Sequence, residues 1–120
     1  MFEPIDGVAD GTVAFRATGI VTGDDYKDTL VPAIEAATAG GRKARLLLVM
    51  GEGFDGYDPR AMLADTSVGI GHFGSFERIA VVTDEDWVRR GIHLFGGLIP
   101  GDVRLFSTAS EDDARAWISA

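Results

Sequence analysis

A strand–loop–helix corner between Arg45 and Met62 constrains the fold of this chain more than any other segment. It begins with an unbroken apolar run, Leu46–Met50, which stops abruptly at Gly51. A loop rich in glycine and acidic residues follows, and Asp58-Pro59 then has the form of a helix start with proline at the first helical position. The apolar run predicts a buried central strand of a parallel sheet. Open α/β sheets usually place their binding sites at such corners.

The corner lacks the side chains that enzymes most often use as nucleophiles or bases. No Ser, Thr, Cys or His occurs in residues 39–65. Its acidic residues, Glu52, Asp55 and Asp58, carry carboxylate oxygens, which are the kind of ligand that a magnesium site uses. However, Asp58 stands before a proline and is explained as a helix N-cap, and solvated acids are the usual case in a loop. We therefore expect no metal, no cofactor and no enzymatic activity.

Strand and helix patterns alternate along the whole chain in the order ββαβαβαβα. The expected strands are Phe2–Ile5, Thr12–Val21, Leu46–Met50, Arg78–Thr83 and Val103–Phe106. The second strand has one more polar face, which predicts that the N-terminal hairpin lies at a sheet edge. We expect one α/β domain over residues 1–120, with a mostly parallel sheet, helices packed on it and an antiparallel N-terminal edge hairpin.

The helices carry recognisable start and stop signals. Thr22, followed three residues later by Asp25, predicts a capping box at the start of the first helix. Pro32 lies in the middle of that helix and predicts a kink. Gly40-Gly41 predicts its end. Ser110, followed by three acidic residues, is expected to cap the last helix.

Composition excludes several functional classes. A net charge of −8 repels nucleic acid and anionic lipid headgroups, and no Lys/Arg cluster with interleaved aromatics appears. The chain has no cysteine, which excludes disulfides and thiolate metal sites. The first residues lack a signal-peptide pattern, and no apolar run approaches the roughly 18 residues of a membrane span. We expect a cytoplasmic protein without a nucleic-acid partner, of the acidic kind typical of bacteria.

Two patterns after the corner resemble functional motifs. Gly69–Gly74 has the glycine spacing of a dinucleotide-binding loop, but it ends a predicted helix instead of opening one, so we interpret it as a helix terminus. Asp65 and His72 lie seven residues apart on one predicted helix face and are the polar candidates for acid–base chemistry. No nucleophile or third ligand is evident beside them. A polar anchor at a helix–loop junction is the preferred interpretation.

The helix expected over Glu85–Ile99 has an apolar arc of roughly 160°, wider than the about 100° that a surface helix needs. Deeper burial, a dimer face and a lipid-facing wall all remain open explanations. In the corner loop, Phe54 and Tyr57 are aromatic residues that can cover an apolar pocket or contact a partner. The candidate ligand or partner surface comprises Phe54, Tyr57, Met62, Trp87, Val88, Ile92, Phe95 and Ile99.

The order of these motifs resembles the SpoIIAA-like proteins. The resemblance rests on Gly51–Asp58, Ala61, Asp65, His72-Phe73, Phe76–Asp84, Trp87, Pro100–Phe106 and Ala114–Trp117. It implies the STAS-type α/β sandwich of anti-sigma-factor antagonists, a fold also likened to CRAL-TRIO lipid-binding domains. It further implies a non-enzymatic domain that binds an apolar or lipid-like ligand or associates peripherally with membranes, and that can form a homodimer.

One departure from the anti-sigma-factor antagonists bears on regulation. Those proteins carry a phosphorylatable Ser or Thr at the start of the helix after the central strand. The equivalent region here, Gly51–Arg60, has no hydroxyl other than that of Tyr57. Switching by serine phosphorylation is therefore not expected. The alternative function is a regulatory protein–protein interaction module without that switch, which predicts that Phe54 and Tyr57 are exposed.

Overall fold

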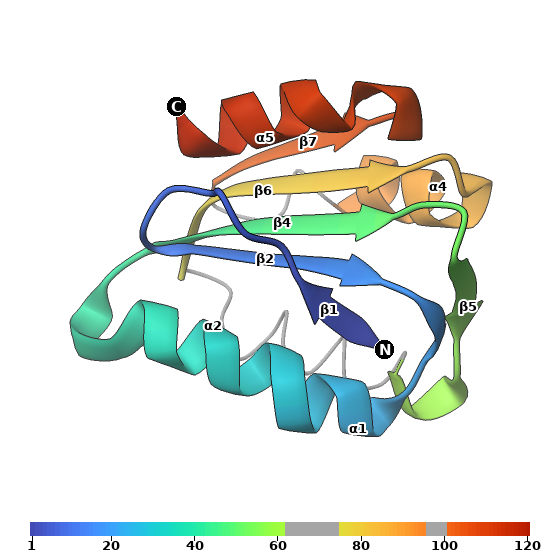
Figure 1. The fold of residues 1–120 in the computed structure, drawn as a ribbon, viewed down its shortest axis with the longest axis horizontal. Coiled ribbons are helices and arrows are strands. Elements are labelled where there is room, and N and C mark those ends of the chain that lie inside the picture. Colours follow the sequence, from blue (N-terminus) through green and yellow to red (C-terminus); the bar gives the residue numbers. More distant parts are fainter. Residues whose placement is uncertain (62–74, 96–100) are drawn as a thin grey trace.

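Strand β4 (Ala44–Met50) lies at the centre of a five-stranded sheet, as its apolar run predicts (Figure 1). The computed structural model describes residues 1–61, 75–95 and 101–120. The other strands are β1 (Phe2–Pro4), β2 (Thr12–Ala17), β3 (Gly19–Val21), β5 (Phe54–Tyr57), β6 (Phe76–Thr83) and β7 (Asp102–Phe106). The helices are α1 (Gly23–Asp25), α2 (Val31–Thr38), α4 (Asp86–Phe95) and α5 (Glu111–Ser119). Short helical turns span Tyr26–Leu30, Ala39–Gly41 and Thr108–Ser110.

The sheet has the strand order β1-β2-β4-β6-β7. Strands β2, β4, β6 and β7 pair in parallel, whereas β1 pairs antiparallel with β2 at the edge. The predicted mostly parallel sheet with an antiparallel N-terminal edge hairpin is confirmed. Parallel strands need covered faces, and helices supply that cover on both sides.

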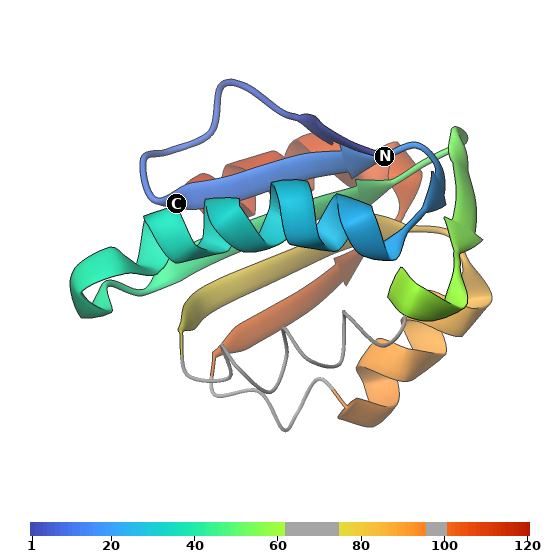
Figure 2. The same ribbon diagram turned by 90° about the horizontal axis from the view of Figure 1, so that it is seen from below.

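Side chains of β4 alternate between two separate cores. Leu46, Leu48 and Met50 belong to one cluster, and Leu47 and Val49 belong to the other. Helices α1, α2 and α4 lie on one face of the sheet, and α5 lies on the opposite face (Figures 1 and 2). This arrangement explains why the run in β4 is apolar at every position.

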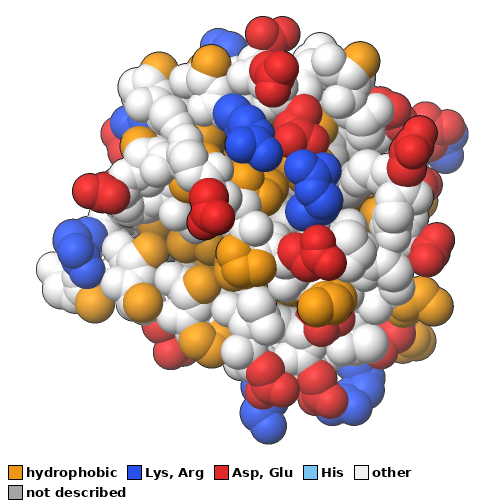
Figure 3. Space-filling view, viewed as in Figure 1, with side chains coloured by type: hydrophobic (Ala, Val, Ile, Leu, Met, Phe, Trp, Pro, Cys, Tyr) orange, Lys and Arg blue, Asp and Glu red, His pale blue; other side chains and the backbone are white. Residues whose placement is uncertain are grey.

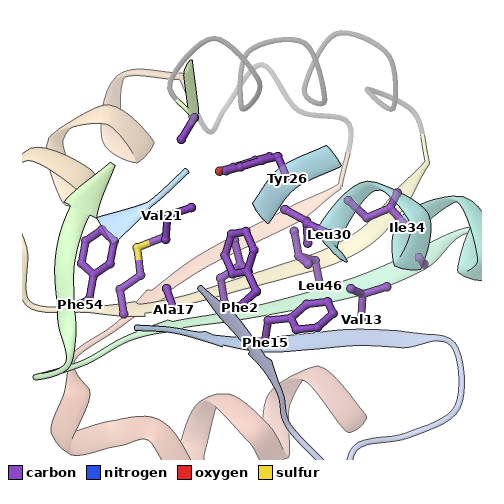
Figure 4. Packing of buried hydrophobic residues seen from close by; sticks show 14 of the residues in the cluster. Phe2, Val13, Phe15, Ala17, Val21, Tyr26, Leu30, Ile34, Leu46 and Phe54 are labelled. Atoms are coloured by element: carbon purple, nitrogen blue, oxygen red, sulfur yellow. The ribbon is translucent and has the colours of Figure 1, made fainter. Parts of the chain in front are cut away.

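The larger core lies under α2 and is rich in aromatic rings (Figure 4). Phe2 packs against Phe15 and against Tyr26, with ring centroids 5.9 and 5.4 Å apart. Leu30 and Ile34 enter from the helical side and are almost wholly buried. This core reaches the carboxyl ends of the strands, where the candidate site lies.

Two elements differ from the sequence prediction. The single strand expected over Thr12–Val21 is two strands in different sheets, because Gly19 adopts φ 62° and redirects the chain after β2. Strand β3 then pairs in parallel with β5, a segment that the sequence predicted as a loop. The sequence of β5, Phe-Asp-Gly-Tyr, contains two residue types that strands usually avoid, so its strand character depends on the partner.

The predicted signals of the first helix are confirmed at its start and end. The side chain of Asp25 accepts a hydrogen bond from the Thr22 N–H at 2.9 Å, and the Asp25 N–H donates to Thr22 Oγ1 at 3.2 Å. Gly40 and Gly41 both have positive φ after α2. Pro32, which was predicted to kink this helix at its middle, lies in the first turn of α2, and a π-helical turn over Tyr26–Leu30 precedes it.

Helix α5 is held to the sheet by arginine side chains at both ends. Near its start, Arg16 of β2 donates two hydrogen bonds to the Glu111 carboxylate, at 3.1 and 2.9 Å. At its end, guanidinium groups of Arg45 and Arg78 donate to backbone carbonyls of the last turn. The predicted Ser110 side-chain cap is wrong, because that hydroxyl pairs with Ser107 instead.

Candidate functional site

The candidate site lies at the carboxyl ends of β4 and β6. Strand β5 follows β4 there, and α4 follows β6, so both elements begin at the same edge of the sheet (Figure 1). Strand β3 reaches the same edge through its pairing with β5. Open parallel sheets place ligands at this edge, outside the strand ends.

Four rings from three parts of the chain form a cluster at this edge, here called the aromatic cluster. Its members are Tyr26, Phe54, Tyr57 and Trp87. The Tyr57 ring lies edge-on to each of the other three rings, at centroid distances of 5.7–5.9 Å. Such edge-to-face pairs add about 0.5–1.5 kcal/mol each to the burial of their area. The cluster is therefore a firmly packed surface.

Burial decreases across the aromatic cluster from the core to solvent. Tyr26 is 1% exposed and Phe54 is 5% exposed, whereas Tyr57 is half-buried and Trp87 is 44% exposed. The prediction that Phe54 is an exposed ring of a loop is wrong, because β5 pairs with β3 and directs this ring into the core. Trp87 is instead the ring that reaches the surface.

A pair of phenol groups lies within this apolar surface. The hydroxyl of Tyr26 donates to the hydroxyl oxygen of Tyr57 over 3.0 Å. Buried phenols need hydrogen-bond partners, and this pair supplies one for each ring. The site therefore combines an apolar wall with one polar point, which is the usual composition of a small-molecule site. Tyr26 was not among the residues predicted from the sequence, although its place beside the capping box is a usable signal.

Burial in the core accounts for only part of the wide apolar arc of helix α4. Val88 packs against the larger core and Ile92 is half-buried. On the other side of the helix, Trp87 and Leu94 are 44% and 73% exposed. Burial in the core therefore accounts for one side of the arc, and an apolar stripe remains at the surface.

Two acids near the site, Asp58 and Asp84, have structural roles, whereas Glu52 and Asp55 of the corner are exposed to solvent. Asp58 accepts a hydrogen bond from the Ala61 N–H at 2.7 Å, as predicted for an N-cap. The Asp84 carboxylate accepts hydrogen bonds from the hydroxyl and the N–H of Thr108, which lower the pKa of Asp84. Within residues 1–61, 75–95 and 101–120, no three His, Cys, Asp or Glu side chains are grouped to hold a metal.

Several predicted site residues fall outside the described part of the structure. They are Met62, Asp65, His72 and Ile99, together with the side chain of Phe95. The glycine pattern Gly69–Gly74 also falls there. Of the eight residues in the predicted apolar surface, the structure brings Phe54, Tyr57 and Trp87 into direct ring contact.

Comparison with known proteins identifies the fold seen here. The sequence pattern that defines the SpoIIAA-like family matches residues 12–119. The chain belongs to the SpoIIAA-like family. It also resembles the crystal structure of an uncharacterized protein of the DUF3478 family with a SpoIIAA-like fold from Shewanella loihica PV-4. The TM-score is 0.77 at 25% identity, over 98% of this chain and 92% of that one. No functionally curated protein matches the sequence.

The SpoIIAA-like fold confirms the predicted fold class. Neither this fold nor the Shewanella protein's description names a ligand, partner or reaction. None of the helices in the described residues has both the length and the hydropathy needed to cross a bilayer.

Proposed function

We propose that this SpoIIAA-like chain is a non-enzymatic binding domain that holds an apolar or lipid-like molecule against the aromatic cluster. The observation that carries the proposal is the partial exposure of Trp87, whose ring packs on Phe54 and Tyr57 at the carboxyl edge of the sheet. Covering an exposed indole with an apolar ligand gains roughly 25 cal/mol for each Å² removed from water.

The phenol pair gives the proposed ligand a polar end. Tyr57 is half-buried, its ring packs edge-on against the exposed indole of Trp87, and its hydroxyl accepts a hydrogen bond from the buried Tyr26. A molecule with an apolar body and one oxygen-containing end, such as a fatty acid or fatty alcohol, matches this arrangement.

Peripheral association with membranes is the related form of the same proposal. The overall charge of −8 opposes adsorption to anionic lipid. Figure 3 shows acidic and basic side chains mixed across the face seen in Figure 1, with hydrophobic side chains scattered between them. Membrane contact would therefore depend on insertion of Trp87, and it would favour neutral over anionic lipid.

Trp87 fluorescence tests the proposal directly. The chain has two tryptophans, so a Trp117→Phe background isolates the signal of Trp87. We expect a blue shift when a long-chain fatty acid or neutral phosphatidylcholine vesicles are added, and loss of binding in a Trp87→Ala protein studied by native mass spectrometry. Ile20→Ala is the matched control, because Ile20 is 58% exposed but is not a member of the aromatic cluster. No shift with either additive and no co-purified lipid would reject the proposal.

The second candidate function is a regulatory protein–protein interaction module without a serine phospho-switch. Exposure of Leu94, two helical turns after Trp87 on α4, favours it, whereas burial of Phe54 removes one of the two rings it was expected to present. It predicts a protein that co-purifies with the wild-type chain and is lost in a Leu94→Glu variant. Ile20→Glu should retain that protein.

A further inference from the structure

A second group of aromatic side chains lies on the α5 side of the sheet, on the face opposite α4 (Figures 1 and 2). The rings of Phe106 on β7 and Trp117 on α5 pack together, with their centroids 6.1 Å apart. Two guanidinium groups lie over the Trp117 ring. The Cζ atom of Arg78 is 5.3 Å from the ring centroid, and that of Arg104 is 5.0 Å from it. The negative face of an indole attracts such cations, so the ring holds both groups in place.

The two arginines differ in what their N–H groups bind. Arg78 donates to the carbonyl oxygen of Trp117 at 2.8 Å and so holds the last turn of α5. Arg104 is exposed and forms no hydrogen bond or ion pair with any residue in the ranges 1–61, 75–95 and 101–120. Even Asp102, two positions earlier on β7, is not paired with it. The N–H groups of Arg104 therefore remain available to a partner.

The other arginines of the chain lack this combination of a stacked plane and free donors. Carboxylates or carbonyls accept hydrogen bonds or ion pairs from Arg16, Arg42, Arg45, Arg60, Arg78, Arg89 and Arg115. Arg90 on α4 also has no acceptor among the described residues, but no ring lies under its guanidinium there. Internal pairing therefore explains the other stacked arginine, Arg78, and leaves Arg104 unexplained.

Stacking on Trp117 prepares Arg104 to bind an oxyanion. The ring contact uses the flat face of the guanidinium and leaves its edge open, where a carboxylate binds through two parallel hydrogen bonds. Because the ring contact already orders this long side chain, less conformational entropy is lost when a partner binds. The geometry is therefore that of a preorganised carboxylate receptor.

We propose that Arg104, Phe106 and Trp117 form a docking site for an acidic segment of another protein. Tryptophan and arginine are the residue types that most often dominate protein–protein interfaces. A small anion at the exposed guanidinium would stay largely in water and bind weakly. A peptide segment adds apolar contact with Phe106 and Trp117, which are both only partly buried. The site thus fits a carboxylate that stands beside an apolar side chain on the partner.

The charge around the site selects a short acidic segment over a longer polyanion. The chain carries a net charge of −8, and the acids Glu77 and Asp102 near the site are exposed. A nucleic acid or an anionic bilayer extends past Arg104 and would be repelled by these carboxylates. A second copy of this acidic chain is opposed by the same long-range repulsion. One carboxylate on a short segment can reach Arg104 without spanning the neighbouring acids.

An NMR titration of the isotope-labelled protein tests the proposal, with the indole N–H of Trp117 and the Nε–H of Arg104 as reporters. The probe is a short peptide of Glu, Ser and Phe, and its matched control has Gln in place of every Glu. We expect the Glu peptide to shift both signals, less strongly as salt is added, and the Gln peptide to leave them unchanged. Equal shifts with the two peptides, or none with the Glu peptide, would overturn the proposal. So would binding of acetate or of a short DNA duplex as tight as that of the Glu peptide.

Substitutions at Arg104 test its role against a matched arginine. Arg104→Gln should weaken binding of the Glu peptide at least about fivefold, as expected for a residue that dominates an interface. Arg90→Gln removes the same charge on the opposite face and should bind like the wild type. Arg104→Lys keeps the charge without the planar fork and should also bind more weakly. Equal binding by Arg104→Gln and Arg90→Gln, or full binding by Arg104→Lys, would reject the stacked guanidinium as the receptor. Trp87→Ala should leave peptide binding unchanged, which separates this site from the proposed apolar ligand.

Discussion

Tyr26 is buried at the end of the larger core and still donates a hydrogen bond into the candidate site. Tyr26→Phe keeps the ring that packs against Phe2 and Tyr57 but removes the hydroxyl. We expect a loss of about 1 kcal/mol in the free energy of unfolding, since buried hydrogen bonds typically contribute that much. Urea unfolding measures it. A Tyr26→Phe protein as stable as the wild type would show that the phenol pair does not stabilise the fold.

Gly101 illustrates a position where the backbone leaves no room for a side chain. A Cβ built there lies 2.7 Å from the carbonyl oxygen of Phe76 and 3.2 Å from that of Glu77. Gly101→Ala should therefore destabilise the protein by about 1–3 kcal/mol, because backbone atoms must move. Gly91→Ala is the control. Its Cβ would meet open space within α4, so alanine should stabilise the helix by about 0.5–1 kcal/mol.

The ion pair between Arg16 of β2 and Glu111 of α5 makes the free energy of unfolding depend on pH. The hydrogen bonds and charge of Arg16 lower the pKa of Glu111 below its ordinary value of 4.5. A carboxyl group with a lowered folded pKa stabilises the fold above its unfolded pKa, and this contribution is lost as pH falls through the folded value. Because both side chains are partly solvent-exposed, the contribution is about 0.5–1 kcal/mol.

Glu111→Gln should accordingly lower stability at neutral pH and flatten its decline in acid. Unfolding by urea at a series of pH values from about 6 to 3 would show both effects. Asp112→Asn removes an exposed acid from the same helical turn and serves as the matched control. If the two variants lose the same stability at every pH, the ion pair with Arg16 has no stabilising role.

Elements differ in how far their own sequence specifies them. Strand β4 and the capping box at Thr22 were predictable, because uniform apolarity and a Thr-x-x-Asp spacing are local signals with local physical causes. Strand β5 and the separation of β3 from β2 were not, because β5 is too short to show a period and the two short strands form a sheet of their own only by pairing with each other. Correct placement of Phe54 depended on that pairing, so its burial could not be predicted from the corner sequence alone.

The candidate site was predictable in its location and only partly in its composition. The corner after β4 was identified from the apolar run that ends at Gly51, and Trp87 was identified from the wide apolar arc of its helix. Tyr26 was missed, because its contribution requires the first helix to lie next to β5, a contact between segments 31 residues apart. Contacts of this kind follow from how elements pack, and periodicity within one element carries no information about them.

The two cores of the whole molecule are unequal, and this difference predicts the order in which parts of it open. Among the residues that the structure describes, the core under α2 contains fifteen buried residues, five of them aromatic, whereas the core under α5 contains seven. Helix α5 itself buries only Ala114 and Ile118 fully. Its attachment therefore depends strongly on the guanidinium groups of Arg45 and Arg78, which bind the carbonyls of its last turn.

Native-state hydrogen exchange should consequently show that α5 opens locally at a lower free energy than β4 or α2. In an Arg45→Met/Arg78→Met protein, the amides of α5 should exchange at least about tenfold faster. Each charged hydrogen bond that is lost contributes about 1.5–3 kcal/mol at most, and hydrogen bonds from water to the freed carbonyls offset part of this loss. Arg42→Met is the control, since its guanidinium donates to the carbonyls of Ala36 and Ala39 at the end of α2. If the Arg45→Met/Arg78→Met protein showed unchanged exchange in α5, the attachment inferred from the two cores would be contradicted. Faster exchange that is confined to α5 in this protein would show that the two arginines hold α5 to the sheet.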